Sequence, residues 1–108
     1  MAKRNLVTSK IRRVFERFGY DTIETPVLNY AEVILGKYGE EGDQLTYTFE
    51  DRGGRRVALP YDLTVPFARL FSANFSKLPI PFKRYQIQRV WRAEKPQKGR
   101  LREFYQCD

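Results

Sequence analysis

The sequence has no histidine, and only one of its 108 residues, Cys107, is a cysteine. Without histidine there is no imidazole to act as a general acid, a general base or a metal ligand. A single cysteine can neither form a disulfide within the chain nor supply the thiolate set of a structural zinc site. We therefore exclude imidazole catalysis and metal sites built on imidazole or thiolate. We also predict a reducing compartment and a small, buried Cys107 side chain.

Long apolar runs are missing as well. The first ten residues, MAKRNLVTSK, lack the apolar core of a secretory signal. No later run approaches the roughly 20 apolar residues that a helix needs to cross a membrane. These absences predict a cytoplasmic protein without a membrane partner.

The charge is strongly basic, with 20 lysines and arginines against 13 acids and a net charge of +7. The basic residues cluster in two stretches, residues 3–17 and 83–102. Such a field suits a phosphate-bearing ligand, nucleic acid or an acidic surface. Solubility explains a basic balance equally well, so charge alone does not name the partner. The ordinary apolar content and abundant aromatic residues predict one folded domain or part of one.

Helical spacing of apolar residues marks the first third of the chain. A helix is predicted over residues 6–18, ending at Gly19 in a left-handed conformation. Its apolar stripe, which should cover a sheet or a partner, consists of Val7, Ile11, Val14, Phe15 and Phe18. Residues 20–25 read as a short strand, residues 27–37 as a second helix, and residues 38–43 as a flexible loop.

Alternating residues predict two hairpins in the remainder. The first joins residues 45–50 to 55–59, and the second joins residues 82–94 to 101–108. Between them, a helix capped by Asp62 or Thr64 should run to about Asn74. This order predicts an α+β fold, an antiparallel β-sheet flanked by helices on one side.

The second hairpin carries the residues of greatest chemical interest. Because strand side chains alternate, one face should collect two guanidiniums, a carboxylate, a ring and an amide, namely Arg92, Glu94, Arg102, Phe104 and Gln106. Guanidiniums bind phosphate oxygens, and an aromatic ring stacks on a base. On spacing alone, a solvated face is the commoner explanation, and Arg92 with Glu94 could form a simple ion pair.

The same stretch resembles motif 2 of the class II aminoacyl-tRNA synthetases, and its loop is close to that of the histidyl-tRNA synthetases. The matching segments are residues 90–94 (VWRAE), 95–100 (KPQKGR) and 104–106 (FYQ). Residues 19–26 resemble motif 1 of the family, and residues 47–54 and 61–69 resemble the segments between the two motifs. Pro60 stands where the family usually has arginine.

The resemblance covers about residues 11–108 and implies a partial class II catalytic domain over residues 1–108. Motif 1 would span about 11–36, a connecting hairpin and helix 44–76, and motif 2 about 82–108. The chain would be an N-terminal catalytic-core fragment of a ligase, weakly active or inactive by itself.

The resemblance implies an activity for the parent protein. It would activate histidine with ATP and Mg²⁺ to histidyl-adenylate, then transfer the histidyl group to the acceptor end of tRNA(His). The parent would be a homodimer, with Pro26 at its interface, and its site would contain no protein-bound metal.

The resemblance also implies roles for individual residues. Arg92 would bind the α-phosphate and stabilise charge during the reaction, Glu94 would accept from the adenine amino group, and Phe104 would stack on adenine. Arg100 or Arg102 would contact phosphate or the tRNA end. The histidine ammonium would be held by Asp62, Thr64 and Gln106.

Simpler explanations exist for several of these residues. Asp62 and Thr64 could serve only as helix caps, Phe104 could be a core aromatic, and Pro26 could simply end a strand. Two alternative functions also follow: a synthetase-like regulatory subunit of ATP phosphoribosyltransferase, and a non-catalytic basic RNA-binding module. An intact Arg92 and Glu94 argue against the regulatory subunit, which need not keep ATP-site residues.

Overall fold

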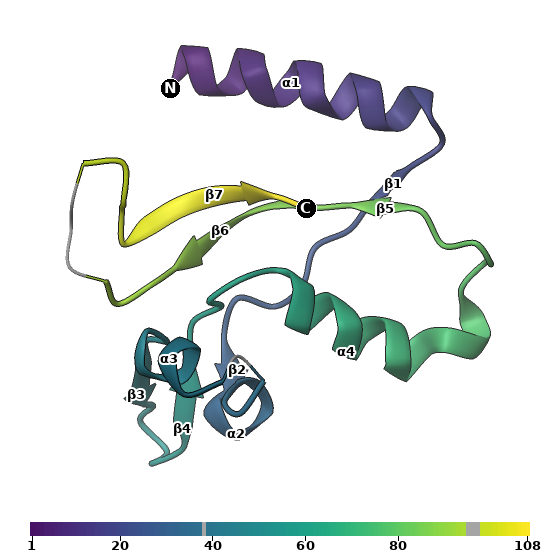
Figure 1. Cartoon of the computed structure of the whole chain (residues 1–108). Coiled ribbons are helices and arrows are strands. Elements are labelled where there is room, and N and C mark those ends of the chain that lie inside the picture. Colours follow the sequence, from purple (N-terminus) through teal and green to yellow (C-terminus); the bar gives the residue numbers. More distant parts are fainter. Residues whose placement is uncertain (38, 95–97) are drawn as a thin grey trace.

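A computed structural model describes residues 1–37, 39–94 and 98–108 (Figure 1). Its elements in chain order are α1 (Ala2–Arg17), β1 (Asp21–Thr22), β2 (Asn29–Tyr30), α2 (Ala31–Ile34), α3 (Gly39–Gln44), β3 (Thr48–Glu50), β4 (Arg56–Ala58), α4 (Thr64–Asn74), a 3₁₀ turn (Phe75–Lys77), β5 (Arg84–Tyr85), β6 (Ile87–Trp91) and β7 (Glu103–Cys107). Helices are combined with mainly antiparallel strands, which confirms the predicted α+β class.

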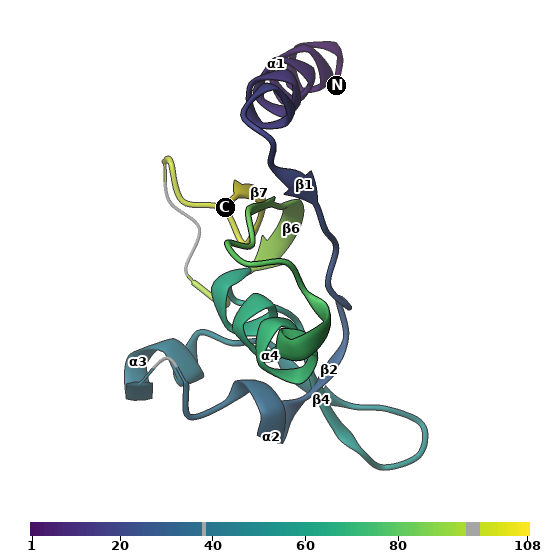
Figure 2. The ribbon, with the colours of Figure 1, turned by 90° about the vertical axis from the view of Figure 1, so that its right-hand side faces the viewer.

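The strands form small separate sheets. β2, β4 and β3 pair antiparallel in that order, β6 pairs antiparallel with β7, and β1 pairs in parallel with β5. Both predicted hairpins are therefore confirmed, but the parallel β1–β5 pair was not predicted. Figures 1 and 2 show the elements in layers, with α1 above the β6–β7 hairpin and α4 between that hairpin and the β2–β4 region.

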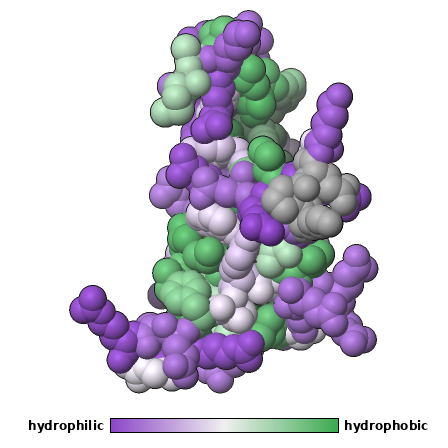
Figure 3. Space-filling view, turned by 90° about the vertical axis from the view of Figure 1, so that its left-hand side faces the viewer, coloured by the Kyte–Doolittle hydropathy of each residue, from purple (hydrophilic) through white to green (hydrophobic). Residues whose placement is uncertain are grey.

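Helix α1 rests on the rest of the chain through a mixed aromatic and polar contact. The ring of Phe15 stacks on Tyr85 with centroids 5.0 Å apart, and the Tyr85 hydroxyl donates to Glu16 Oε1 at 2.9 Å. Within the predicted stripe, Ile11 and Phe15 are half-buried, whereas Val7, Val14 and Phe18 are exposed. The helix therefore covers the rest of the chain only along the side of the stripe that meets Tyr85. Figure 3 shows green apolar side chains among purple hydrophilic ones on α1.

The end of α1 follows the sequence prediction. Gly19 adopts a φ of +81°, a left-handed conformation that favours glycine. The Lys83 ammonium donates to the carbonyl oxygen of Phe18 at 2.6 Å, which satisfies one of the free carbonyls at the helix end.

The segment after Pro26 differs most from expectation. Instead of one helix over residues 27–37, the chain forms β2 and then a single turn of helix, α2. Pairing of Tyr30 with Val57 draws these residues into the sheet, because sheet contacts override a weak helical preference. The predicted loop contains helix α3, and Tyr38 lies outside the described residues. The Asp43 carboxylate accepts from the Gly36 amide at 2.9 and 3.0 Å, which ties α3 to the end of α2.

The core lies where α2, β4 and α4 meet. Ala31, Ile34 and Ala58 are buried there, with the half-buried Val65 packed against them. Other buried apolar residues are Val57, Leu63, Tyr85 and Val90. Helix α4 has Leu63 at its N-cap position, and the capping contact comes from the residue before it, because the Asp62 carboxylate accepts from the Val65 amide at 3.4 Å. Thr64 is the first residue of the helix rather than its cap.

The Cys107 prediction is wrong, because this side chain is exposed. It lies on the face of β7 that points toward α1, and α1 does not cover it completely. Partial burial still raises the pKa of its thiol. Within the described residues, no helix combines the length and apolar character needed to cross a membrane.

Candidate functional site

The β6–β7 hairpin brings the predicted polar face together. Val90 lies opposite Phe104 and Gln88 opposite Gln106. The pairing continues beyond the strands, because the Arg92 amide donates to the carbonyl of Arg102 at 2.9 Å. The inward and outward alternation read from the sequence is therefore correct for this face.

A hollow of about 400 Å³ opens at the loop end of this face. Its lining residues are Arg92, Glu94, Gly99, Arg100, Leu101 and Phe104. The volume falls within the range of roughly 300–1,000 Å³ that is usual for small-molecule sites. Four predicted nucleotide-site residues thus share one concave surface. They are two arginines (Arg92 and Arg100), one glutamate (Glu94) and one phenylalanine (Phe104).

Arg92 is held in place on two sides. Its Nε donates to the carbonyl oxygen of Tyr61 at 3.1 Å. The guanidinium carbon lies 4.3 Å from the Tyr61 ring centroid and 5.2 Å from that of Phe104. This arrangement uses the Nε–H donor, while the two terminal nitrogens carry the four N–H groups suited to bidentate phosphate binding.

Glu94 and Arg100 face each other across the hollow. The Glu94 carboxylate lies 3.9 Å from Arg100 Nη1, at the distance limit of an ion pair, and Arg100 belongs to the segment that precedes β7. The Arg100 side chain is largely exposed, and such surface pairs contribute little stability. Glu94 is therefore available to exchange this contact for a ligand.

Arg102 shares the predicted face of the hairpin but lies outside the hollow. Its Nε donates to the main-chain carbonyl of Glu94 at 2.8 Å, and its exposed side chain is not part of the lining of the hollow. This contact holds the two strands together where they meet the connecting loop. The structure thus favours Arg100 over Arg102 as the second cation of the pocket.

The segment from Pro60 to Thr64 runs along the hairpin through three contacts. The Trp91 amide donates to the carbonyl of Pro60 at 2.9 Å, and Arg92 Nε donates to that of Tyr61. Thr64 Oγ1 lies 3.4 Å from Asp108 Oδ2. Pro60 is buried, and its main-chain carbonyl supports the hairpin next to Arg92.

The three predicted ligands of an ammonium group differ in their surroundings. Gln106 is half-buried, and its Oε1 is shielded from solvent with no hydrogen-bond partner in the described part of the chain. This oxygen retains its full acceptor capacity. Asp62 uses one oxygen to cap α4, and Thr64 contacts Asp108. Sequence reasoning missed Tyr61 and Asp108 as members of this site, although alternation along β7 already placed Asp108 on the same face as Gln106.

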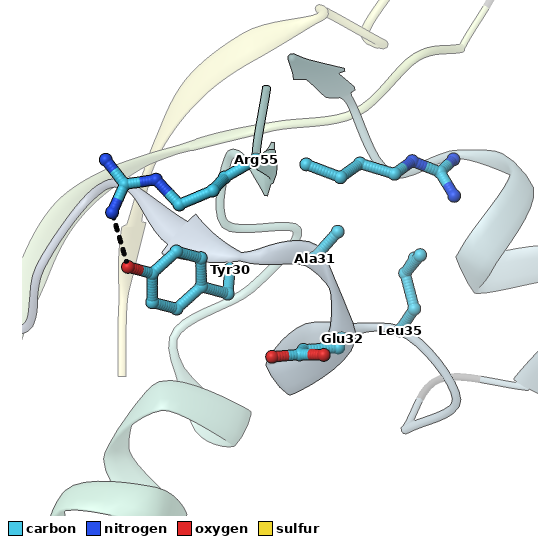
Figure 4. A pocket seen from close by; sticks show the side chains of 6 residues that line it. Tyr30, Ala31, Glu32, Leu35 and Arg55 are labelled. Atoms are coloured by element: carbon cyan, nitrogen blue, oxygen red, sulfur yellow. Dashed lines mark hydrogen bonds between the residues drawn. The ribbon is translucent and has the colours of Figure 1, made fainter. Parts of the chain in front are cut away.

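Pro26 belongs to another surface. It lines a depression of about 380 Å³ together with Leu28, Tyr30 and Arg55, among others. A neighbouring depression of about 530 Å³, shown in Figure 4, is lined by Tyr30, Ala31, Glu32, Leu35, Arg55 and Arg56. There, Arg55 Nη1 donates to the Tyr30 hydroxyl at 3.0 Å. No sequence motif predicted this second depression.

The described residues contain no group of three or more histidine, cysteine, aspartate or glutamate side chains that could hold a metal ion. Glu94 is the carboxylate of the hollow, and a single carboxylate does not make a magnesium site.

Comparison with known sequences gives a consistent result. The sequence profile of the family described as Histidyl-tRNA synthetase matches residues 1–107. The histidine–tRNA ligase of Aeropyrum pernix is 53% identical over 110 residues, which cover 100% of this chain and 25% of that protein. The histidine–tRNA ligase of Phocaeicola vulgatus is 45% identical over 130 residues, which cover 100% of this chain and 29% of that protein. The chain thus spans 25% and 29% of the length of these two relatives.

Comparison with solved structures agrees. The histidyl-tRNA synthetase of Nostoc sp. PCC 7120 superposes with a TM-score of 0.80 at 36% identity, over 98% of this chain and 24% of that one. A Bacillus halodurans protein described as an ATP phosphoribosyltransferase regulatory subunit/histidyl-tRNA synthetase gives a TM-score of 0.79 at 29% identity. The superposition covers 95% of this chain and 26% of that one.

Proposed function

The chain belongs to the histidyl-tRNA synthetase family, and from this premise we propose that it supplies one wall of a site that activates histidine with ATP. The observation that carries the proposal is the hollow shared by Arg92, Glu94, Arg100 and Phe104. In it, a fixed cation lies beside an aromatic ring that is open to a ligand. Phosphate binding and base stacking need this combination.

Arg92 is the central residue of the proposed reaction. The histidine carboxylate attacks the α-phosphorus of ATP, a new phosphorus–oxygen bond forms, and the bond to the leaving pyrophosphate breaks. Negative charge on the non-bridging α-phosphate oxygens is greatest in the transition state. A guanidinium already held by Tyr61 needs little reorganisation to stabilise that charge.

The nucleotide base would be recognised at the other side of the hollow. Phe104 stacks on adenine, and its contact with Arg92 is replaced or shared when the base enters. Glu94 accepts a hydrogen bond from the adenine amino group after exchanging its long contact with Arg100. Arg100, released in this way, is free to bind a phosphate or the end of a tRNA, and Arg102 stays a weaker candidate for that role.

The part of the site that binds the amino acid would use hydrogen-bond acceptors for the ammonium group of histidine. An ammonium offers three donors and no acceptor. Asp62, Thr64 and Gln106 provide a carboxylate, a hydroxyl and an amide carbonyl along the segment and strand that flank Arg92. Magnesium would enter on the phosphates of ATP, since the described residues hold no metal cluster.

The partners of the whole protein follow from the family. We propose histidine and tRNA(His) as substrates, with the histidyl group passing to the acceptor end of the tRNA. We propose a homodimer contact on the surface around Pro26, which is supported by the exposure of Val27, Leu28 and Tyr30 there. The residues lining the hollow favour this ligase over the regulatory-subunit alternative.

The test is MgATP binding to the chain by calorimetry, with and without histidine. We expect measurable MgATP binding by the wild-type chain and a dissociation constant at least tenfold higher in Arg92→Ala. The matched control is Arg89→Ala, since Arg89 lies on the opposite face of the same strand and also contacts an aromatic ring, that of Tyr105.

A second readout is histidine-dependent exchange of pyrophosphate into ATP, which we expect to be weak or undetectable for this chain. Strong exchange that survives Arg92→Ala would exclude the role proposed for Arg92. RNA binding that weakens steeply with salt and is not reduced by ATP would instead favour the basic RNA-binding module.

A further inference from the structure

The carboxylate of Asp108 joins side chains from two distant segments. Arg84 Nη2 donates to Asp108 Oδ2 at 2.7 Å, and the Thr64 hydroxyl donates to the same oxygen at 3.4 Å. Thr64 begins α4, whereas Arg84 lies in β5. The carboxylate therefore connects the predicted ammonium-binding segment to a strand that no sequence motif linked to function.

Asp108 is fixed by its main chain as well as by Arg84. Its amide donates to the carbonyl of Gln86, and the Gln86 amide donates back to the carbonyl of Asp108, both at 2.9 Å. Arg84 is itself restrained: its side chain is 10% exposed, its Nη1 donates to the Asp108 carbonyl at 2.8 Å, and its guanidinium carbon lies 4.0 Å from the Phe67 ring centroid. The carboxylate is thus a preorganised acceptor.

This geometry decides the direction of the Thr64 hydroxyl. A hydroxyl has one proton and two lone pairs. Because a carboxylate only accepts, the Thr64 proton points to Asp108, and the lone pairs of Thr64 are left for another donor. An ammonium group is such a donor. Without Asp108, the hydroxyl could turn its proton toward the ligand and repel it.

The charges around Asp108 indicate that it acts by orientation. The hairpin carries Arg92, Arg100 and Arg102 near the proposed site, and their field disfavours a cationic group. Because Arg84, 2.7 Å away, offsets the charge of the Asp108 carboxylate, Asp108 contributes by directing the Thr64 proton and not by a net negative field. It lies two residues after Gln106 on the same face of the hairpin, beside a shielded acceptor oxygen without a partner in the described part of the chain.

We propose that Asp108, braced by Arg84, is a positioning residue that orients Thr64 to accept a hydrogen bond from the ammonium group of the amino-acid substrate. The proposal deepens the function proposed above and rests on the amino-acid end of that site. It predicts recognition of the ammonium group, not of the side chain or the carboxylate of the amino acid.

The experiment compares two ligands that differ by that group alone, histidine and imidazolepropionic acid, by calorimetry in the presence of MgATP. The wild-type chain should bind histidine at least tenfold tighter than imidazolepropionic acid. In Asp108→Asn, histidine binding should weaken about tenfold, while binding of imidazolepropionic acid should stay within twofold. Asp108→Glu keeps the carboxylate and should recover part of the preference.

Matched controls separate orientation from folding. Glu103→Gln removes a carboxylate from the opposite face of β7, where Glu103 accepts from Trp91 Nε1 at 2.6 Å, and should leave the preference unchanged. Melting temperatures measured for every variant report loss of structure. All variants have the same terminal amine and carboxylate, so the effect of these groups is the same in each comparison.

Each outcome has one meaning. An equal loss for both ligands in Asp108→Asn would overturn the proposal, because a structural role predicts that result. A wild-type chain that binds MgATP through Arg92 but does not prefer histidine would overturn it and leave the nucleotide site intact. A chain that binds neither MgATP nor histidine would overturn both this inference and the proposed function.

Discussion

The guanidinium carbon of Arg92 lies 5.2 Å from the ring centroid of Phe104, and on the opposite face of the hairpin Arg89 lies 5.2 Å from the ring of Tyr105. The two pairs have the same chemistry and the same spacing. Only the first lines the hollow and is braced by Tyr61. The hairpin therefore contains its own internal control for an arginine–aromatic pair.

Replacing Phe104 with leucine should weaken MgATP binding. Stacking on an aromatic ring contributes about 1–3 kcal/mol per base, so the dissociation constant should rise roughly 5- to 150-fold. Calorimetry of Phe104→Leu measures this change directly. The matching change Tyr105→Leu, on the other face, should alter the dissociation constant less than twofold. Equal losses in both variants would point to damage of the hairpin rather than to stacking.

Replacing Glu94 with glutamine should alter base preference more than overall affinity. The carboxylate accepts from an amino group but repels the carbonyl oxygen that inosine triphosphate carries at the same position. A glutamine amide can donate to that oxygen. A hydrogen bond to a charged group contributes about 1.5–3 kcal/mol, and the glutamine amide oxygen can still accept from the amino group, so we expect the fall in ATP binding at the lower end of this range, about tenfold. The preference for ATP over inosine triphosphate should shrink. A preserved preference in Glu94→Gln would exclude contact with the amino group.

The turn of the first hairpin should make stability dependent on pH. Hydrogen bonds to the Asp51 carboxylate, above all from the Arg55 amide, lower the pKa of Asp51 below its ordinary value of 3.8. A lowered folded-state pKa stabilises the fold above the unfolded value, and this contribution is lost as pH falls through the folded value. Melting temperatures of Asp51→Asn should therefore depend less steeply on pH below about 4 than those of the wild type. Glu50→Gln, on the adjacent exposed residue, should keep the wild-type slope.

The small core should be sensitive to truncation at Ile34. This side chain is 1% exposed, and Ile34→Ala should cost about 2–5 kcal/mol, as large-to-small changes in cores do. Val14, which belongs to the apolar stripe of α1, is 55% exposed. Val14→Ala should change the free energy of unfolding by less than about 0.5 kcal/mol. Urea denaturation of the two variants checks the contrast, and a large loss in Val14→Ala would mean that a partner covers this face of α1.

Local patterns were sufficient for parts of the fold. Alternation over residues 45–59 and 82–108 predicted two hairpins and the correct face for Arg92 and Phe104. The prediction succeeds because a strand places successive side chains on opposite faces whatever its surroundings. The caps were also readable, since Gly19 and Asp62 act on their own neighbours.

Patterns failed where distant segments decide the conformation. Residues 27–37 have helical spacing, but pairing with β4 turns Asn29 and Tyr30 into a strand. The stripe of α1 was expected to cover a sheet or a partner, and within this chain only the residues that meet Tyr85 and its neighbours are covered. In each case the competing interaction involves residues far away in the sequence, which no local period reports.

The hairpin face with Arg92, Glu94 and Phe104 was determined by the sequence alone, because period-two alternation and side-chain chemistry are local properties. Only the tertiary structure decided that Tyr61 braces Arg92, that Arg100 rather than Arg102 lines the hollow, and that Asp108 turns toward Thr64 and Arg84. Contacts between residues that are 31 and 44 positions apart depend on how the chain packs. Packing is a property of the whole fold and not of any one stretch.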